Sequence, residues 1–361
     1  MSYKRQKKKR AYILRRNRIL AIRQRKQKRR RKRMARASIG HIPHTSSQRV
    51  TPLQNHLKQI QKQNVLSATN DFRLLHNTLK CSQFFKRLLS MDNAYSLQNG
   101  EKTISIGIRQ VAQIDFASTM LLNAIEEELA ILRCNVSSKL PKEEKSRKYL
   151  IESGYLNKKY VNGRMIINPG NTLVMDVQRG EDRIKVDNIR AFIAMMEKVY
   201  QHLHSSKSIH HESYVSILKE ICSNSAEWGN IVRRNWTIGV KFEEGKAIFV
   251  ALDLGQGILK SLYRNFYDII ADMRKPDWQI LEGAFNEHYG SKSKEDNRNQ
   301  GLPFIKQCSV RGIIKELCVI SNNVMLDFTN SNNNCVFSSS QNVFPGTLYS
   351  WVIDASCLTV N

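Results

Sequence analysis

The chain has 361 residues, of which 41% are hydrophobic, so it is long and apolar enough to form two domains with packed cores. No run approaches the roughly eighteen apolar residues of a membrane-spanning helix, and arginines interrupt the first residues throughout, so we expect neither a transmembrane segment nor a signal peptide. Its seven cysteines form no CxxC pair, which argues against a disulfide framework and predicts reduced thiols in a bacterial cytoplasm.

Most of the net charge of +27 lies in the first 36 residues, which contain 19 Lys and Arg and no acidic residue and leave +8 for the rest of the chain. Such a block cannot bury itself, so we expect a basic arm that is disordered alone or helical on a partner. Neutralised phosphates release counterions, so DNA or RNA is the favoured partner of residues 1–36. An anionic membrane, an acidic protein and a solubilising role are the alternatives. The residues expected to contact nucleic acid are Lys7, Lys8, Lys9, Arg10, Arg29, Arg30, Arg31, Lys32 and Arg33.

The predicted fold class is α/β (α+β), with the arm and its linker at 1–45 and two domains at 46–180 and 181–361. In the first domain, a strand-like run Thr103–Ile108 is followed by Val111–Ser118 and by a helix predicted at Met120–Leu132. These segments, with Pro141 and the string ESGY, resemble the STAS-type domain that precedes an ATPase module in some bacterial proteins.

In anti-sigma antagonists of the STAS fold, a serine that follows the aspartate is phosphorylated. Here Phe116 follows Asp115, and Ser118 is the nearby hydroxyl. The two interpretations of Ser118 are a phosphorylation switch and an ordinary helix N-cap.

The second domain contains four short segments in a fixed order. The first lies in a helix predicted at Tyr214–Ala226, where Glu220 and Asn224 share a face because they are four residues apart. The second follows a strand predicted at Lys246–Leu252, and a helix is predicted from Ile258. The segments are Glu220-Ile221-Cys222-Ser223-Asn224, Asp253-Leu254-Gly255-Gln256-Gly257, Asn299-Gln300-Gly301-Leu302-Pro303-Phe304-Ile305-Lys306, and Phe344-Pro345-Gly346-Thr347, which opens a strand predicted at Leu348–Ile353.

Together, in this order, the segments resemble the GHKL superfamily of ATPases, whose Bergerat fold is an α/β sandwich with a mixed sheet. The resemblance covers about residues 185–361 and implies ATP and Mg²⁺ as ligands. It implies that Asn224 holds Mg²⁺, that Glu220 orients or activates a water, and that Asp253 accepts the adenine amino group. The other expected nucleotide contacts are Gly255 and Gly257 around the base, Gly301 and Leu302 at the phosphates, Thr347 behind Asp253, and Lys292, Lys294 and Arg298 in a polar lid at 290–299.

Physical chemistry supports these roles. A carboxylate recognises an exocyclic amine by accepting its hydrogen, Mg²⁺ prefers oxygen ligands, and a glycine turn at a helix start offers N–H groups to phosphate. Two positions depart from the family pattern: Trp228 stands where many relatives have His, and Pro303, where a second glycine is usual, has no N–H to donate.

Four histidines, at positions 202, 204, 210 and 211, precede the first segment, but no carboxylate or cysteine completes a metal-ligand pattern, so we interpret them as a connector.

The sequence therefore predicts a nucleotide-dependent switch, with slow Mg²⁺-dependent ATP hydrolysis that uses Glu220 as base, tethered to nucleic acid by its arm. A protein partner and ATP-dependent dimerisation, as in several relatives, are further expectations. The alternatives are an anti-sigma-like serine/threonine kinase and a non-catalytic nucleic-acid-binding scaffold.

Overall fold

The computed structural model describes residues 65–90, 96–98, 101–131, 133–155, 159–161, 164–166, 172–177, 186–203, 211–226, 236–265, 275–286, 301–339 and 344–359. Residues 58–361 form one compact unit, to which all of these belong. The basic arm and the lid with Lys292, Lys294 and Arg298 lie outside the described residues.

A seven-stranded sheet forms the centre of the second half of the chain, in the order β14-β13-β12-β15-β11-β10-β9. Residues predicted as strands at 246–252 and 348–353 are confirmed as parts of β11 and β15. The strands are β9 (Thr172–Val177), β10 (Trp236–Glu243), β11 (Lys246–Asp253), β12 (Lys315–Ser321), β13 (Val324–Asp327), β14 (Cys335–Val336) and β15 (Thr347–Asp354). β9 falls inside the range 46–180 that the sequence assigned to the first domain, yet it pairs with β10.

Every described pairing in this sheet is antiparallel, so the prediction of a mixed sheet is wrong for these strands. The reason is the placement of β15. β11 and β12 run in the same direction, but β15 lies between them and pairs with both. Between β9 and β10, two successive helices return the chain to the end of the sheet that it left, which also gives an antiparallel neighbour.

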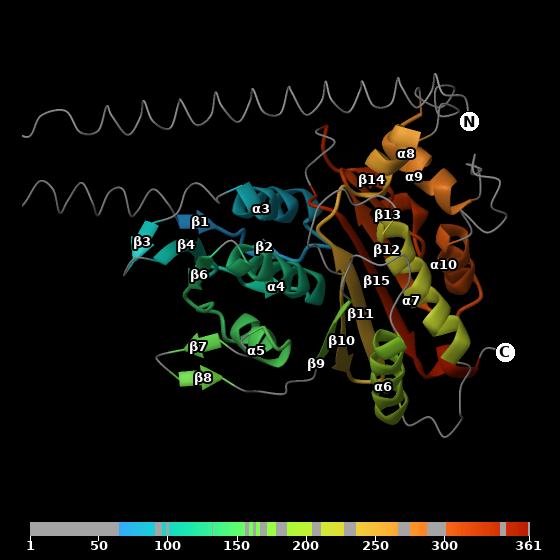
Figure 1. Cartoon of the computed structure of the whole chain (residues 1–361), viewed down its shortest axis with the longest axis horizontal. Coiled ribbons are helices and arrows are strands. Elements are labelled where there is room, and N and C mark those ends of the chain that lie inside the picture. Colours follow the sequence, from blue (N-terminus) through green and yellow to red (C-terminus); the bar gives the residue numbers. More distant parts are fainter. Residues whose placement is uncertain are drawn as a thin grey trace, which may run out of the picture. The chain divides into compact units, whose positions relative to one another are not determined.

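Helices cover one face of the sheet (Figure 1). Their apolar sides pack on sheet residues such as Ile238, Phe249 and Trp351, and the rings of the last two stack with centroids 5.1 Å apart. The helix predicted at 214–226 is confirmed, and so is the start of a helix at Ile258. The helices are α6 (Val186–His202), α7 (His211–Ala226), α8 (Ile258–Asn265), α9 (Asp277–Phe285) and α10 (Gly301–Val310).

The first half of the described chain is a smaller α/β arrangement. Its sheet has β1 and β6 parallel to β4 on either side, with β3 antiparallel to β4. Residues 103–107 of the predicted strand lie in β4, and residues 120–131 of the predicted helix lie in α4. The elements are β1 (Val65–Ser67), β2 (Asp71–Phe72), α3 (Thr78–Ser90), β3 (Ser96–Gln98), β4 (Glu101–Gly107), β5 (Gln113–Ile114), α4 (Phe116–Ile131), β6 (Cys134–Ser138), α5 (Glu144–Glu152), β7 (Lys159–Val161) and β8 (Arg164–Ile166).

Helix α4 packs on the face of the seven-stranded sheet opposite to α6, α7 and α10 (Figure 1). The fit is close at Gly239 of β10, where a Cβ would come within 2.7 Å of the sulfur of Met120. Leu252 and Leu348 of the sheet share one core with Phe116 and Met120 of α4. The sheet is therefore covered on both faces, and its polar features are concentrated at its two ends.

The helices that the structure describes are all too short or too polar to cross a bilayer.

Candidate nucleotide site

Helix α7 carries the first segment. Glu220 is half-buried in its third turn, and burial raises the pKa of its carboxyl above the ordinary value, while the neighbouring Lys219 acts in the opposite direction. Asn224 lies one turn later on the same helix, although its side chain is outside the description. Glu220 and Asn224 therefore both lie in α7, four residues apart, as the sequence predicted.

The second segment is a tight turn between β11 and α8. Asp253 is the last residue of β11 and is 4% exposed, and its Oδ1 accepts the N–H of Gly255. Gly257 has a φ of 81°, a left-handed conformation that glycine adopts without strain, and α8 begins at the next residue. The carboxylate of Asp253 is thus held in place by a backbone N–H of the turn that follows it.

The fourth segment lies beside the second. Thr347, the first residue of β15, is the register partner of Asp253 and is buried. The preceding Gly346 has a φ of 120°, and a Cβ there would overlap the carbonyl group of Asp253. Thr347 and Asp253 therefore lie side by side, and glycine at 346 is required by the close approach of the two strands.

The third segment begins helix α10 at Gly301, which is buried, whereas Leu302 is half-exposed. The first four N–H groups of a helix have no partner within the helix, so the amides of 301, 302 and 304 are at an end that favours anions. Pro303 falls in this first turn, where its missing N–H breaks no helical hydrogen bond. Gly301 therefore lies at the amino-terminal end of α10.

The directions of α7 and α10 bring the segments to one end of the sheet. The hydroxyl of Tyr214, near the start of α7, donates to the carbonyl of Ile313 (3.1 Å), between the end of α10 and the start of β12. β12 then runs to Ser321, which pairs with Thr347. The start of α7 and the end of α10 thus lie where β12 begins, and their other ends lie toward Asp253 (Figure 1).

Element lengths support this placement. A helix of 16 residues, such as α7, spans about 24 Å. A strand of 7 residues, such as β12, spans about 23 Å. The last turns of α7 therefore lie at the end of the sheet where β12 and β11 finish.

Two residues of the site were missed at the sequence level. Ser321 and Asn322, at the end of β12, are buried, and the Asn322 amide donates to the carbonyl of Gln256 (2.8 Å) in the second segment. The signal that could have found them is Ser-Asn-Asn after an apolar strand, because Asn is favoured in tight turns.

Ser118, in the first half of the chain, is fully buried. Its hydroxyl donates to the carbonyl of Phe72 (2.5 Å) and accepts the N–H of Leu74 (2.9 Å). The interpretation of Ser118 as an N-cap is wrong, because Asp115 accepts the Ser118 N–H (2.8 Å) at the start of α4. With both functions of its hydroxyl used in the core, Ser118 is poorly placed for a kinase.

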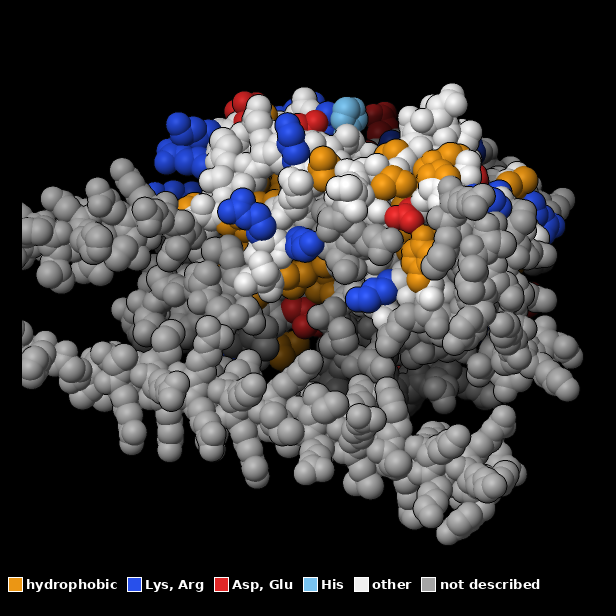
Figure 2. Space-filling model, turned by 90° about the horizontal axis from the view of Figure 1, so that it is seen from above, with side chains coloured by type: hydrophobic (Ala, Val, Ile, Leu, Met, Phe, Trp, Pro, Cys, Tyr) orange, Lys and Arg blue, Asp and Glu red, His pale blue; other side chains and the backbone are white. Residues whose placement is uncertain are grey.

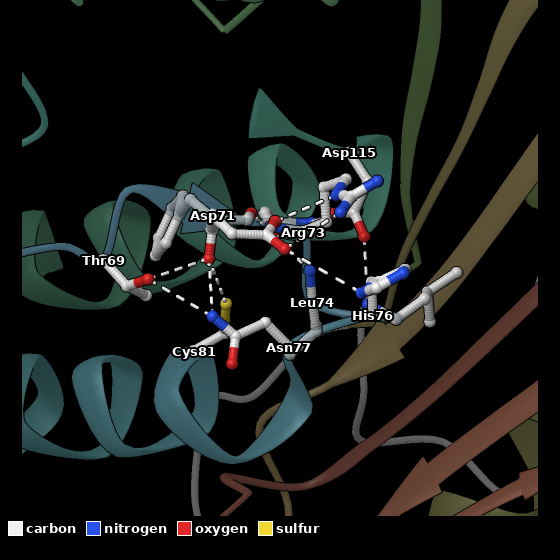
Figure 3. Close-up of polar contacts among 11 residues, drawn as sticks. Thr69, Asp71, Arg73, Leu74, His76, Asn77, Cys81 and Asp115 are labelled. Atoms are coloured by element: carbon white, nitrogen blue, oxygen red, sulfur yellow. Dashed lines mark hydrogen bonds and ion pairs between the residues drawn. The ribbon is translucent and has the colours of Figure 1, made fainter. Parts of the chain in front are cut away.

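Figure 3 shows the polar cluster around that helix start. Asp115 also accepts the N–H of Leu75 (2.9 Å), and burial raises the pKa of its carboxyl despite these hydrogen bonds. Asp71 forms two hydrogen bonds with Arg73, both 2.9 Å, which lower the pKa of Asp71. The Asp71–Arg73 pair and the hydrogen bond from Leu75 to Asp115 therefore fix the loop before α3.

Among the described residues, no group of three or more His, Cys, Asp and Glu side chains is arranged to hold a metal ion. Of the four histidines noted in the sequence, His202 lies 2.6 Å, by its Nε2, from the carbonyl of Glu243, while the side chains of the other three lie outside the description. The seven cysteines all lie among the described residues, and none of them is joined to another by a disulfide.

Comparison with protein-family models, with curated proteins and with solved structures found no match to this chain.

Proposed function

We propose that this protein is an ATP-binding, nucleotide-dependent switch of the GHKL type, and that its second half is a Bergerat-fold domain. One observation carries the proposal: four segments that are far apart in the sequence, at 220–224, 253–257, 301–306 and 344–347, belong to elements that end or begin at the same end of one sheet. A chance resemblance of four short strings would not require such a convergence.

In this proposal, the carboxylate of Asp253 accepts the amino group of adenine, and Thr347 lies behind it. The burial of Asp253 supports this role, because a hydrogen bond in a water-poor environment discriminates strongly between bases. The close approach of Gly346 to Asp253 keeps the neighbouring backbone compact.

The triphosphate would extend toward α10, where the first-turn amides of Gly301 and Leu302 can meet phosphate oxygens. Mg²⁺ takes oxygen ligands, and an amide oxygen with phosphate oxygens is a suitable set, so Asn224 is the residue that would hold it. When bound, the ion would neutralise part of the phosphate charge. The position of Asn224 one helical turn beyond Glu220 fits this assignment.

Glu220 would act as the base in slow ATP hydrolysis. It takes a proton from a water whose oxygen attacks the γ-phosphorus, while the bond to the bridging oxygen breaks and ADP leaves. The raised pKa of Glu220 supports this role, because a base is most effective when its pKa lies near the working pH.

Calorimetric titration of the full-length protein with ATP and Mg²⁺ tests the proposal. We expect saturable binding, and phosphate release that requires Glu220. Binding without phosphate release but with transfer of γ-phosphate to a partner protein would instead identify a kinase. The absence of any binding would overturn the nucleotide proposal and leave the scaffold alternative.

We propose further that the basic arm tethers the switch to nucleic acid. Its 19 basic residues in 36 positions support this, and helix α3 adds Lys80, Lys86 and Arg87 on its exposed side, with no acidic residue in the helix. Figure 2 shows Lys and Arg side chains on one face of the described part, with some Asp, Glu and His side chains among them.

Salt dependence tests the nucleic-acid proposal. If about eight phosphates are engaged, the logarithm of the binding constant should fall with the logarithm of salt concentration with a slope near −7. Replacing Arg29, Arg30, Arg31, Lys32 and Arg33 by Gln should reduce the slope. A slope near zero, or one unchanged by the five substitutions, would contradict the tether.

A further inference from the structure

The turn between β12 and β13 connects two of the four segments although it belongs to neither. It consists of Asn322 and Asn323, both 2% exposed, between paired Ser321 and Val324. Asn322 has a φ of 60°, in the left-handed region that Asn tolerates better than most residues. A buried turn with two amide side chains must satisfy their polar groups internally.

Asn322 and Ser321 hold the turn between β11 and α8. The Asn322 amide donates to the carbonyl of Gln256 (2.8 Å), and its Oδ1 lies 3.4 Å from the backbone nitrogen of Lys260, which donates to it. The hydroxyl of Ser321 accepts the N–H of Ile258 (2.8 Å), the first residue of α8. Both side chains thereby satisfy N–H groups in the first turn of α8, as N-capping side chains do, but from a distant strand.

The space around Gly257 shows how tightly the two turns fit. A Cβ added at Gly257 would overlap the amide group of Asn322. Gly257 and Asn322 are thus complementary: the missing side chain of the first leaves room for the second.

The same turn also holds the fourth segment. The carbonyl of Asn322 accepts the N–H of Phe344 (2.7 Å), and Ser321 pairs with Thr347. Asn322 therefore contacts the residues that follow Asp253 and those that precede its partner Thr347. A shift of Asn322 would move both walls of the proposed adenine site.

We propose that Asn322, assisted by Ser321, is a positioning residue that aims the carboxylate of Asp253 at the amino group of adenine and so sets the preference for adenine over other purines. The inference rests on the proposed nucleotide function. The path of contacts is short: Asn322 fixes the carbonyl of Gln256, the adjoining Gly255 donates its N–H to Asp253, and Asp253 meets the base. Hydrogen bonds weaken steeply when their angles change, so a small rotation of the carboxylate lowers selectivity.

The test compares ATP with inosine triphosphate, which carries a carbonyl oxygen in place of the amino group. Wild-type protein should bind ATP about 5- to 150-fold more tightly than inosine triphosphate, because only adenine donates to Asp253. The variant Asn322→Gly removes the amide but keeps a residue that adopts a φ of 60° without strain. We expect it to lose at least about 5-fold in ATP affinity, with inosine triphosphate affinity nearly unchanged.

Asn323→Gly is the matched control, because this neighbouring amide donates instead to Asp277 (2.7 Å) and to the carbonyl of Ser338 (3.2 Å). It should lower the melting temperature without changing the ratio of the two affinities. Ser321→Ala, which removes the partner of the Ile258 N–H, should reduce the ratio as Asn322→Gly does, and it keeps the test valid if Asn322→Gly does not fold.

An unchanged ratio in Asn322→Gly and Ser321→Ala, an equal loss of both nucleotides, or the same change of ratio in Asn323→Gly would overturn the positioning role while leaving ATP binding intact. Failure of the wild-type protein to bind either nucleotide would instead overturn the nucleotide function itself, and this inference with it.

Discussion

The two ends of the seven-stranded sheet use aspartate in different ways. At one end, Asp253 is buried and accepts the main-chain N–H of Gly255. At the other, Asp354, the last residue of β15, accepts a hydrogen bond from Lys315 (2.8 Å), and both side chains remain partly exposed. Strand β11 begins beside Asp354 and ends at Asp253, so its length separates the two carboxylates.

The contrast separates a stabilising arrangement from one suited to a ligand. At the Asp354 end, the pair of Lys315 and Asp354 joins β12 to β15, and Lys241 pairs with Glu243 (2.7 Å) within β10, so charged groups of opposite sign meet there. At the Asp253 end, the buried polar residues Ser321, Asn322 and Thr347 surround turns that require glycine. Burying polar side chains destabilises a fold, so such side chains are expected mainly where they contribute to binding a ligand.

The largest expected effect concerns Glu220, at the Asp253 end. Glu220→Gln removes the proposed base while keeping the size of the side chain, so phosphate release from ATP should fall about 100- to 10 000-fold. Because a base must be deprotonated, release by the wild-type protein should also decline as pH falls through the raised pKa of Glu220. A phosphate-release assay over pH checks both expectations. Retained activity in Glu220→Gln would contradict the assignment.

Glycines at the two ends offer a paired test of folding. Gly346→Ala places a Cβ against the carbonyl of Asp253 at a φ of 120°, and we expect it to lower the free energy of unfolding by about 3 kcal/mol. Gly245→Ala, in the turn between β10 and β11, also has a positive φ, 69°, but its Cβ would meet open space, so about 1 kcal/mol is expected. Urea denaturation measures both. Equal losses would show that Gly346 is not constrained by Asp253.

Asp253→Asn should weaken ATP binding about 5- to 150-fold, since an amide replaces the carboxylate acceptor. Asp354→Asn is the control at the other end and should leave the dissociation constant for ATP unchanged. Calorimetry on the two variants decides between a local effect at Asp253 and a general effect on the fold. An equal loss in both would refute the difference between the ends.

The smallest effect is expected for the stability of Asp354→Asn. Burial alone would raise the pKa of Asp354, but hydrogen bonds from Lys315, Ser356 and Cys357 outweigh it and hold that pKa well below the ordinary value. A depressed carboxyl pKa stabilises the fold at pH above the unfolded value, near 3.9, and this stabilisation is lost as pH falls toward the folded pKa.

Because the Lys315–Asp354 pair is partly exposed, the loss in Asp354→Asn at pH 7 should be no more than about 1 kcal/mol. The difference from the wild-type protein should shrink between about pH 4 and pH 2. Urea denaturation at several pH values measures it, and a difference that grows on acidification would have the wrong sign.

Local patterns predicted the elements well, and distant contacts were not predictable. The period of Val215, Leu218 and Cys222 is a property of one helix, so the boundaries near 214 and 226 followed from sequence. The contact of Asn322 with Gln256 joins residues 66 positions apart and depends on where β15 enters the sheet. The residues of neither segment indicate the order of the strands in the sheet.

The same limit explains two errors. Ser118 follows Asp115 by three residues, and from the sequence either residue could cap the start of the helix. In the structure the hydroxyl of Ser118 binds the backbone of Phe72 and Leu74, so it is not available as a cap. The mixed sheet was expected from the family resemblance. In the structure β11 and β12 run in the same direction, but β15 lies between them and pairs with both, so no parallel pair forms there.

Amide hydrogen exchange with and without ATP and Mg²⁺ compares the two ends of the sheet in one experiment. The account predicts slower exchange in residues 255–260 and 301–305 when nucleotide is present, with no change in residues 241–246 and 354–359. Protection at the Asp354 end, or bound nucleotide that leaves both the turn after Asp253 and the start of α10 unprotected, would contradict the claim that the Asp253 end holds the purine triphosphate.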